Sequence, residues 1–332
     1  MLTCHRLFVG VAYSMGPDWS DPQAIQHWPS RIGSQLADKV ATQISYDSQT
    51  GERTTWGFLC DLADPGLQTE RFFKLYIDPV YRDKFPDAPT VLEARRWYRD
   101  YLECIYGAIT QFFSESHPRS MSKNIEFLFS VPTTWRNPSM IAATMRLIKE
   151  AGFEQRPNHI ARITLTEAEA AAVYTSKQQY ATGDIILVCD AGGGTTDVNV
   201  LKLASSGRKK TELVPLSWVE GQEIGSALLD FKMQRLIEER LQLVRTRLQG
   251  EPSAIADMIM RDEKFETFKC SFGSSAMNIP TLPLSIPNLS PGYNFQPARI
   301  ADSKLIVTRY APSPHCLRVQ LTRQGGITSR VR

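Results

Sequence analysis

Hydrophobic and polar positions along the chain predict short strands that alternate with helices. Apolar residues gather in strand-length segments at 8–13, 124–131 and 184–190, and such continuous segments are typical of buried strands. Segment 39–46 alternates between apolar and polar residues, as expected of a half-buried strand. Segment 89–116 instead repeats its apolar positions at near-helical spacing. Strands that alternate with helices indicate an α/β protein.

Two helix starts are marked by residues that can cap them. Asn137 precedes Pro138, which suits the first helical position, and Gly152 ends the same helix as a glycine cap would. Thr166 and Glu169 have the spacing of a capping box that opens an alanine-rich helix. This structural role explains Glu169 better than a catalytic role does.

The later part of the chain continues this pattern and then changes. We expect further strands at 162–165, 197–202 and 214–219, a long amphipathic helix at about 224–248 and another helix at about 253–270. Five of the 20 prolines fall between 280 and 297, which predicts a loop or an extended connection before a short ordered element at 302–309.

Composition excludes several classes of protein. The chain has 332 residues, of which 42% are hydrophobic and 22% charged, so it can bury a real core. The last 23 residues carry four arginines and no acidic residue, whereas residues 1–309 carry 34 basic and 35 acidic side chains, so the net charge of +3 comes from the last 23 residues. This charge gives no reason to expect a nucleic-acid partner. No apolar segment reaches the roughly 18 residues of a membrane helix. The six cysteines have no metal-ligand spacing, and we expect a reduced, cytoplasmic location.

The clearest chemical signal is the glycine-rich segment 190–197, which lies directly between two predicted strands. Its three glycines allow backbone N–H groups to approach a phosphate closely: Gly192, Gly193 and Gly194. Thr195 adds a hydroxyl group, and Asp190 can hold magnesium through water. The alternative is a tight hairpin in which the glycines only permit the turn. The flanking aspartates and threonines favour a phosphate site, although no Walker lysine follows.

This segment resembles the second phosphate loop of the actin-like ATPase superfamily, and specifically that of heat-shock protein 70 relatives. Four other segments resemble motifs of that family in the same order along the chain: 129–135, 166–172, 221–226 and 265–269. Trp56-Gly57 and Phe73-Lys74-Leu75 resemble the divergent, fungal-type branch. The resemblance covers about residues 7–309.

The resemblance implies an actin-like ATPase, or ribonuclease H-like, fold with two lobes around a nucleotide cleft. The first lobe would span 1–180 and the second, incomplete, lobe 181–309, and a basic tail at 310–332 would stay unmatched. The family binds ATP or ADP with Mg²⁺ and couples ATP hydrolysis to chaperone activity. Its partners would be the nucleotide and client or co-chaperone proteins, with neither nucleic acid nor membrane.

The resemblance also assigns roles to individual residues. Glu167 and Asp190 would act through metal-bound water, with Asp190 as the metal residue, and Asp197 would be accessory or would order the turn. The nucleotide would contact seven residues: Gly192, Gly193, Gly194, Thr195, Gly221, Glu266 and Lys269. The residues themselves leave alternatives open, since Glu167 also suits the first turn of a helix and Lys269 a solvated helix face.

Two parts of the family's ATPase site have no match. Segment 3–7 lacks the aspartate, glycine and threonines of the first phosphate loop, and segment 56–61, where the catalytic lysine would fall, contains no lysine. The adenosine turn expected after 309 is also missing. We therefore expect weak or absent hydrolysis. The alternatives are a catalytically silent binding module, a non-functional truncated product and a sugar-kinase-like phosphotransferase.

Overall fold

The computed structural model describes most of the chain, in the following ranges: 2–4, 8–17, 21–61, 64–83, 88–133, 135, 137–176, 180–193, 195–206, 211–216, 220–222, 225–260, 263–271 and 280–308. The chain divides into two compact units, Met1–Glu223 and Ile224–Arg332. The lobe boundary expected after residue 180 stays a prediction, and the expected tail at 310–332 lies outside the described residues.

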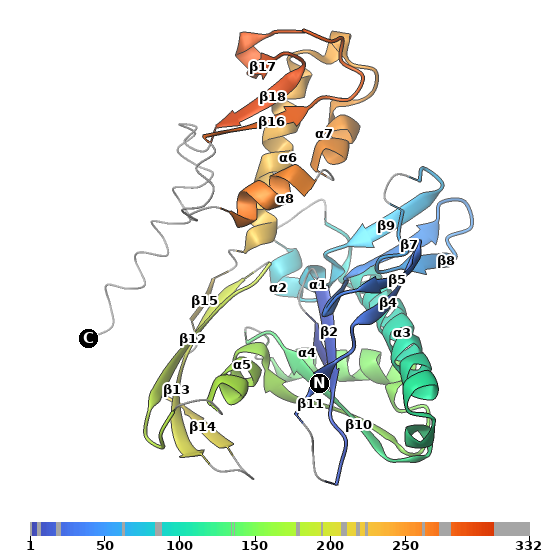
Figure 1. Cartoon of the computed structure of the whole chain (residues 1–332), viewed down its shortest axis with the longest axis vertical. Coiled ribbons are helices and arrows are strands. Elements are labelled where there is room, and N and C mark those ends of the chain that lie inside the picture. Colours follow the sequence, from blue (N-terminus) through green and yellow to red (C-terminus); the bar gives the residue numbers. More distant parts are fainter. Residues whose placement is uncertain are drawn as a thin grey trace. The chain divides into compact units, whose positions relative to one another are not determined.

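The first unit is built on a mixed sheet that contains three parallel strands (Figure 1). The strand order is β11-β10-β1-β2, and β3 and β6 both pair with β2. The bounds are β1 Leu2–Cys4, β2 Phe8–Tyr13, β3 Gln23–Ala24, β6 Lys39–Ala41, β10 Ile125–Val131 and β11 His159–Thr166. Because β10 is parallel to both β1 and β11, the carboxyl ends of these three strands lie at one edge. The predicted α/β class is confirmed.

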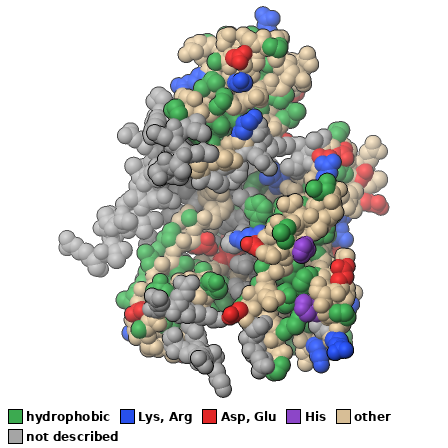
Figure 2. Space-filling view, viewed as in Figure 1, with side chains coloured by type: hydrophobic (Ala, Val, Ile, Leu, Met, Phe, Trp, Pro, Cys, Tyr) green, Lys and Arg blue, Asp and Glu red, His purple; other side chains and the backbone are tan. Residues whose placement is uncertain are grey.

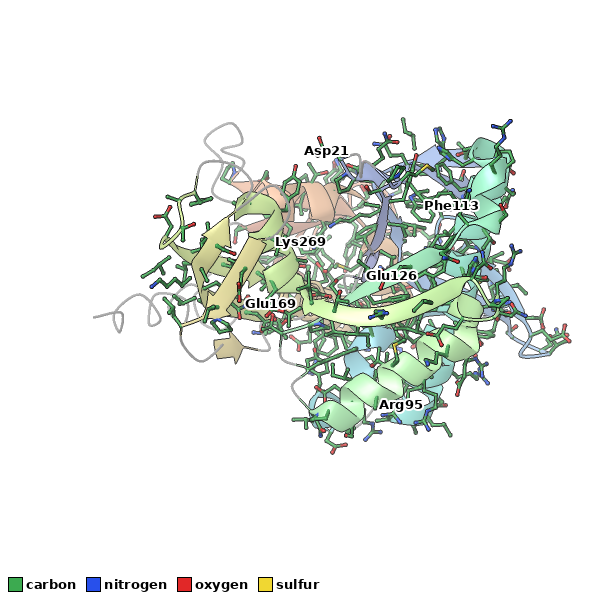
Figure 3. The ribbon with its side chains drawn as sticks, turned by 90° about the horizontal axis from the view of Figure 1, so that it is seen from below. Asp21, Arg95, Phe113, Glu126, Glu169 and Lys269 are labelled. Atoms are coloured by element: carbon green, nitrogen blue, oxygen red, sulfur yellow. The ribbon has the colours of Figure 1, made fainter. Side chains whose placement is uncertain are left out.

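Local signals placed the main helices of this unit correctly. Helix α3 (Val91–Ser116) starts with a capping box and buries an aromatic and aliphatic face, with Arg95 and Phe113 toward its two ends (Figure 3). Helix α4 (Pro138–Ile148) is capped by the Asn137 side chain, which accepts a hydrogen bond from the backbone N–H of Ser139. A π-helical turn, η2 (Lys149–Phe153), follows, with Gly152 at a φ of 99°. The predicted cap and glycine end are therefore confirmed.

Smaller elements surround this sheet, and one prediction among them is wrong. Segment 39–46 is two strands, because β6 joins the main sheet while the following strand pairs with β8 and β9. The additional elements are β4 His27–Ser30, β5 Gly33–Leu36, β7 Gln43–Asp47, β8 Arg53–Trp56, β9 Leu67–Arg71, α1 Phe73–Tyr76, α2 Pro79–Arg82 and η1 Pro118–Ser122. The chain therefore passes from the main sheet to the β7–β9 sheet between Ala41 and Gln43.

A second sheet of this unit carries the glycine-rich segment. It contains β12 Ile185–Ala191, β13 Thr196–Ser206, β14 Thr211–Pro215 and β15 Glu220–Gln222, and β13 pairs with the other three strands. Helix α5 (Glu167–Ser176) packs against β12 and β13. The prediction of a buried strand at 184–190 is wrong, since Ile185 and Leu187 are each 64% exposed. Hydrophobic side chains show on the surface over this sheet, because α5 covers one face only (Figure 2).

The second unit consists of helices and a small antiparallel sheet of order β16-β18-β17. Its elements are α6 Ser226–Gln242, η3 Arg245–Arg247, α7 Pro252–Met260, α8 Glu263–Cys270, β16 Thr281–Ser285, η4 Gln296–Ala298, β17 Ile300–Ala301 and β18 Lys304–Thr308. The helix expected at 253–270 is thus two helices. The loop expected at 280–297 contains β16, whose Pro283 is tolerated because β16 pairs on one side, with β18.

None of the helices in the described ranges combines the length and apolar character needed to cross a bilayer.

Candidate functional site

The junction between β11 and α5 is fixed by a capping box. The backbone N–H and the hydroxyl of Thr166 donate to Glu169 Oε2 at 2.8 and 2.9 Å, and the backbone N–H of Glu169 donates to Thr166 Oγ1 at 3.2 Å. Figure 3 labels Glu169 in this first turn. The structural role predicted for Glu169 is confirmed. Glu167, the first residue of α5, is thereby held at the carboxyl edge of the parallel strands.

Glu167 forms a buried ion pair with a lysine from a distant segment. Lys74 Nζ lies 2.8 Å from Glu167 Oε1, and the two side chains are 1% and 12% exposed. A buried ammonium group is strongly unfavourable without a counter-ion, so this pairing is what allows Lys74 to be charged there. Lys74 belongs to the short helix α1, which Phe72 precedes with a φ of 59°. Backbone strain of this kind in a residue other than glycine is concentrated at functional sites.

An indole ring lies on another side of the same ammonium group. The ring centroid of Trp135 is 5.7 Å from Lys74 Nζ, and the Trp135 side chain is buried. A cation at this distance from an indole ring is attracted by the electrons of the ring. Trp135 follows β10, whose last residue, Val131, is in register with Thr166 at the end of β11. The carboxylate and the ring are therefore both positioned by the carboxyl ends of β10 and β11.

The glycine-rich segment forms the turn between β12 and β13. Asp190 and Asp197 are directly opposite each other in the strand register at the base of this turn. The hydroxyl of Thr195 donates to Asp197 Oδ2 at 3.0 Å, and the backbone N–H of Gly192 donates to the carbonyl oxygen of Thr195 at 2.9 Å. Thr195 and Asp197 are buried. Asp197 thus helps to order the turn, through a threonine hydroxyl.

The other candidate residues of the first unit lie beside the glycine turn or outside the described residues. Gly221, in β15, is in register with Asp197, so Asp190, Asp197 and Gly221 form one row across three strands. Gly193 lies in the turn, and Gly194 lies outside the described residues. In segment 3–7, Thr3 and Cys4 belong to β1 and the other three residues are likewise outside the description.

Two candidates belong to α8 of the second unit. Lys269 Nζ donates to Asp230 Oδ1 of α6 at 2.8 Å, and both side chains are largely buried. Lys269 Nζ also lies 5.9 Å from the centroid of the Phe265 ring. Lys269 is therefore tied to α6 and is not a solvated side chain. Glu266 is in α8, but its side chain lies outside the described residues.

The donor set fits magnesium bound mainly through water and phosphate. Among the described residues, no three or more His, Cys, Asp or Glu side chains are grouped so as to hold a metal ion by themselves. Mg²⁺ keeps several of its waters and often takes only one or two protein carboxylates beside phosphate oxygens. Asp190, at the base of a glycine turn and opposite Asp197, is consistent with that type of site.

Lys74 and Trp135 were not among the residues expected at the site. Segment 56–61 was the expected place for a lysine, and the structure brings one to Glu167 from α1 instead. One signal in the sequence points to it, because Lys74 is enclosed by apolar residues on both sides in 72–76. A lysine within such a segment is forced into the core when the segment is buried.

Comparison with known proteins finds similar solved structures but no matching family model. No family model matches the sequence, and no curated protein matches it. Among solved structures, the chain is similar to MreB5 of Spiroplasma citri bound to ADP and to MreB5 of Spiroplasma citri bound to AMPPNP. In each comparison the TM-score is 0.49 and the identity 14%, over 99% of this chain and 75% of the MreB5 chain.

Proposed function

We propose that the chain binds ATP with Mg²⁺ as a protein of the actin-like ATPase superfamily, with the β12–β13 turn as its phosphate site. The register that sets Asp190 opposite Asp197 at the base of the glycine turn carries this proposal. Asp197 is bonded to the Thr195 hydroxyl, which orders the turn. Asp190 is the carboxylate that we assign to the water shell of Mg²⁺, and the glycine N–H groups are assigned to the phosphates.

The position of Lys74 and Glu167 supports a phosphoryl-transfer role. In open α/β sheets, ligands bind beyond the carboxyl ends of the parallel strands, and both residues lie at that edge. The Lys74 ammonium group would stabilise negative charge that develops on the transferred phosphoryl group. Glu167 would hold that ammonium group in place and orient metal-bound water. Lys74 thus supplies the positive charge that segment 56–61 lacks.

The family resemblance assigns three further residues to the nucleotide. Gly221 has no side chain to obstruct a nucleotide, and Glu266 and Lys269 are assigned to the ribose and adenine.

Within the actin-like ATPase superfamily, we propose that the chain is a relative of heat-shock protein 70. This proposal rests on the ordered segments 166–172, 221–226 and 265–269, and it carries ATP hydrolysis coupled to client or co-chaperone binding. The second candidate is a silent nucleotide-binding module. Segment 3–7 favours that candidate, because it contains neither the glycine nor the acidic residue of the first phosphate loop.

Calorimetric titration of the full chain with ATP and Mg²⁺, followed by measurement of phosphate release, tests the proposal. We expect micromolar binding, and we expect Asp190→Asn to weaken it about tenfold or more, which corresponds to about 1.4 kcal/mol. Asp21→Asn, at an exposed position, is the matched control and should bind as the wild type does. Binding without phosphate release favours the silent module. Absence of binding by the wild type, or unchanged binding by Asp190→Asn, contradicts the proposal.

A further inference from the structure

The amide nitrogen of a buried asparagine on β13 has no hydrogen-bond partner among the residues that the structure describes. The side chain of Asn199 is 2% exposed, and its Nδ2 atom contacts no acceptor among the described residues. A buried amide donor that gives up its hydrogen bonds to water without replacement costs free energy, so nearly all such groups are satisfied by protein or by ordered water. Asn199 therefore needs an acceptor that the described protein groups do not supply.

Asn199 lies beside the carboxylate pair of the glycine turn. Residues two apart in a strand point to the same face, so Asn199 and Asp197 share one face of β13, and both are buried there. The register sets Asn199 opposite Val188 and Asp197 opposite Asp190. Asp190 is therefore a diagonal neighbour of Asn199, roughly 7–8 Å away, a distance that one water molecule can bridge.

We propose that Asn199 is a positioning residue of the phosphate site and that its Nδ2 donates a hydrogen bond to a buried water molecule linked to the Asp190–Asp197 carboxylate pair. Ionised carboxylates accept hydrogen bonds, so both members of the pair can accept one from a water molecule. A water molecule held by the amide has two O–H groups to give to these oxygens. It thereby fixes the carboxylate that meets the waters of Mg²⁺.

The role of Asn199 in metal binding rests on the proposed function, whereas the bound water does not. A high-resolution crystal structure of the ligand-free full chain tests the water directly. We expect a water oxygen within about 2.7–3.2 Å of Asn199 Nδ2 and of an oxygen of Asp190 or Asp197. The inference is overturned if no water molecule lies at this position, or if Asn199 Nδ2 bonds directly to a protein group. This holds whatever the nucleotide titration gives.

Three variants test the effect of the amide on the site. At fixed ATP, the Mg²⁺ concentration that gives half of the thermal stabilisation should rise about tenfold in Asn199→Val, which corresponds to about 1.4 kcal/mol. Asn199→Ser retains a hydroxyl donor and should stay near the wild-type value. Leu201→Val changes packing two residues further along the same buried face and should lower the unfolding temperature without moving the Mg²⁺ midpoint.

The outcomes separate this inference from the proposed function. If wild-type protein is not stabilised by Mg²⁺ and ATP, the proposed function fails, and the crystallographic water alone decides the inference. If the wild type is stabilised and Asn199→Val shifts the midpoint less than twofold, the inference is overturned while the proposed function stands.

Discussion

Lys74 and Glu167 are 93 residues apart in the sequence, and their side chains form a buried ion pair with 2.8 Å between Nζ and Oε1. Lys74→Met leaves the Glu167 carboxylate without this counter-ion, and we expect the free energy of unfolding to fall by about 3–5 kcal/mol. All six tryptophans belong to the first unit, so urea unfolding followed by tryptophan fluorescence reports on that unit.

Two controls accompany this measurement. The double variant Lys74→Met with Glu167→Leu removes both charges and should recover most of the lost stability. Arg162→Met breaks an exposed pair with Glu126 and should cost no more than about 1 kcal/mol. Equal losses for Lys74→Met and Arg162→Met would show that the buried pair has no special energetic weight.

Two glycines near the same helix should respond oppositely to alanine. Gly152 has a φ of 99°, and a Cβ atom there would lie 3.3 Å from the Tyr106 ring, so Gly152→Ala should destabilise the first unit by about 1–2 kcal/mol. Gly107 lies inside α3, and a Cβ atom there would contact nothing within 4 Å. Gly107→Ala should therefore stabilise the unit by about 0.5–1 kcal/mol. Urea midpoints decide both, and the same sign for both variants would contradict this account.

His159 should make the first unit sensitive to acid. Its Nδ1 atom is 2.9 Å from the hydroxyl of Tyr106, and burial, with a smaller effect of Arg156, lowers the pKa of His159. The unfolded chain, with histidine near its ordinary pKa of about 6.5, then takes up the proton more readily than the folded chain. The stability linked to His159 is therefore complete above about pH 6.5 and is lost as the pH falls below that value.

Urea unfolding at pH 7 and pH 5 measures this effect. The fall in stability between the two pH values should be smaller for His159→Gln than for the wild type. His27→Gln, at an exposed position, should retain the wild-type fall. A pH dependence that is the same in His159→Gln and wild type would rule out His159 as the source.

The capping box of α5 should stabilise the helix that carries Glu167. Thr166→Val retains the shape of the side chain but removes the hydroxyl that donates to Glu169, and we expect a loss of about 1 kcal/mol. Thr175→Val, at a half-buried position later in α5, is the control and should change stability by less than about 0.5 kcal/mol. Urea unfolding of both variants checks this, and equal losses would mean that the cap contributes nothing of its own.

Local features of the fold could be predicted from the sequence, and long-range features could not. The Asn137 cap and the Thr166–Glu169 box depend on residues within three positions, so their spacing alone specified them. The contact between Lys74 and Glu167 depends on how α1 packs, which no local pattern records. The exposure of Ile185 and Leu187 was missed for the same reason, because an apolar strand does not reveal whether one face or both will be covered.

The same difference between local and long-range features applies to the candidate site. Its glycine turn is continuous in sequence and could be identified there, whereas the row of Asp190, Asp197 and Gly221 appears only with the strand register. The sequence does not predict the role of Asn199, because a polar residue in a strand is ordinarily expected on its exposed face.

The parallel pairing of β1 with β10 has a consequence for the biogenesis of the protein. Leu2 pairs with Phe129, and β10 pairs in turn with β11, which ends at Thr166. At 5–20 residues per second, a ribosome needs about 6–25 s to add the residues between these two partners. During that interval the edge of β1 that later pairs with β10 has no partner, and the first parallel ladder cannot close. This high contact order predicts slow folding that follows, and does not accompany, the translation of the first 166 residues.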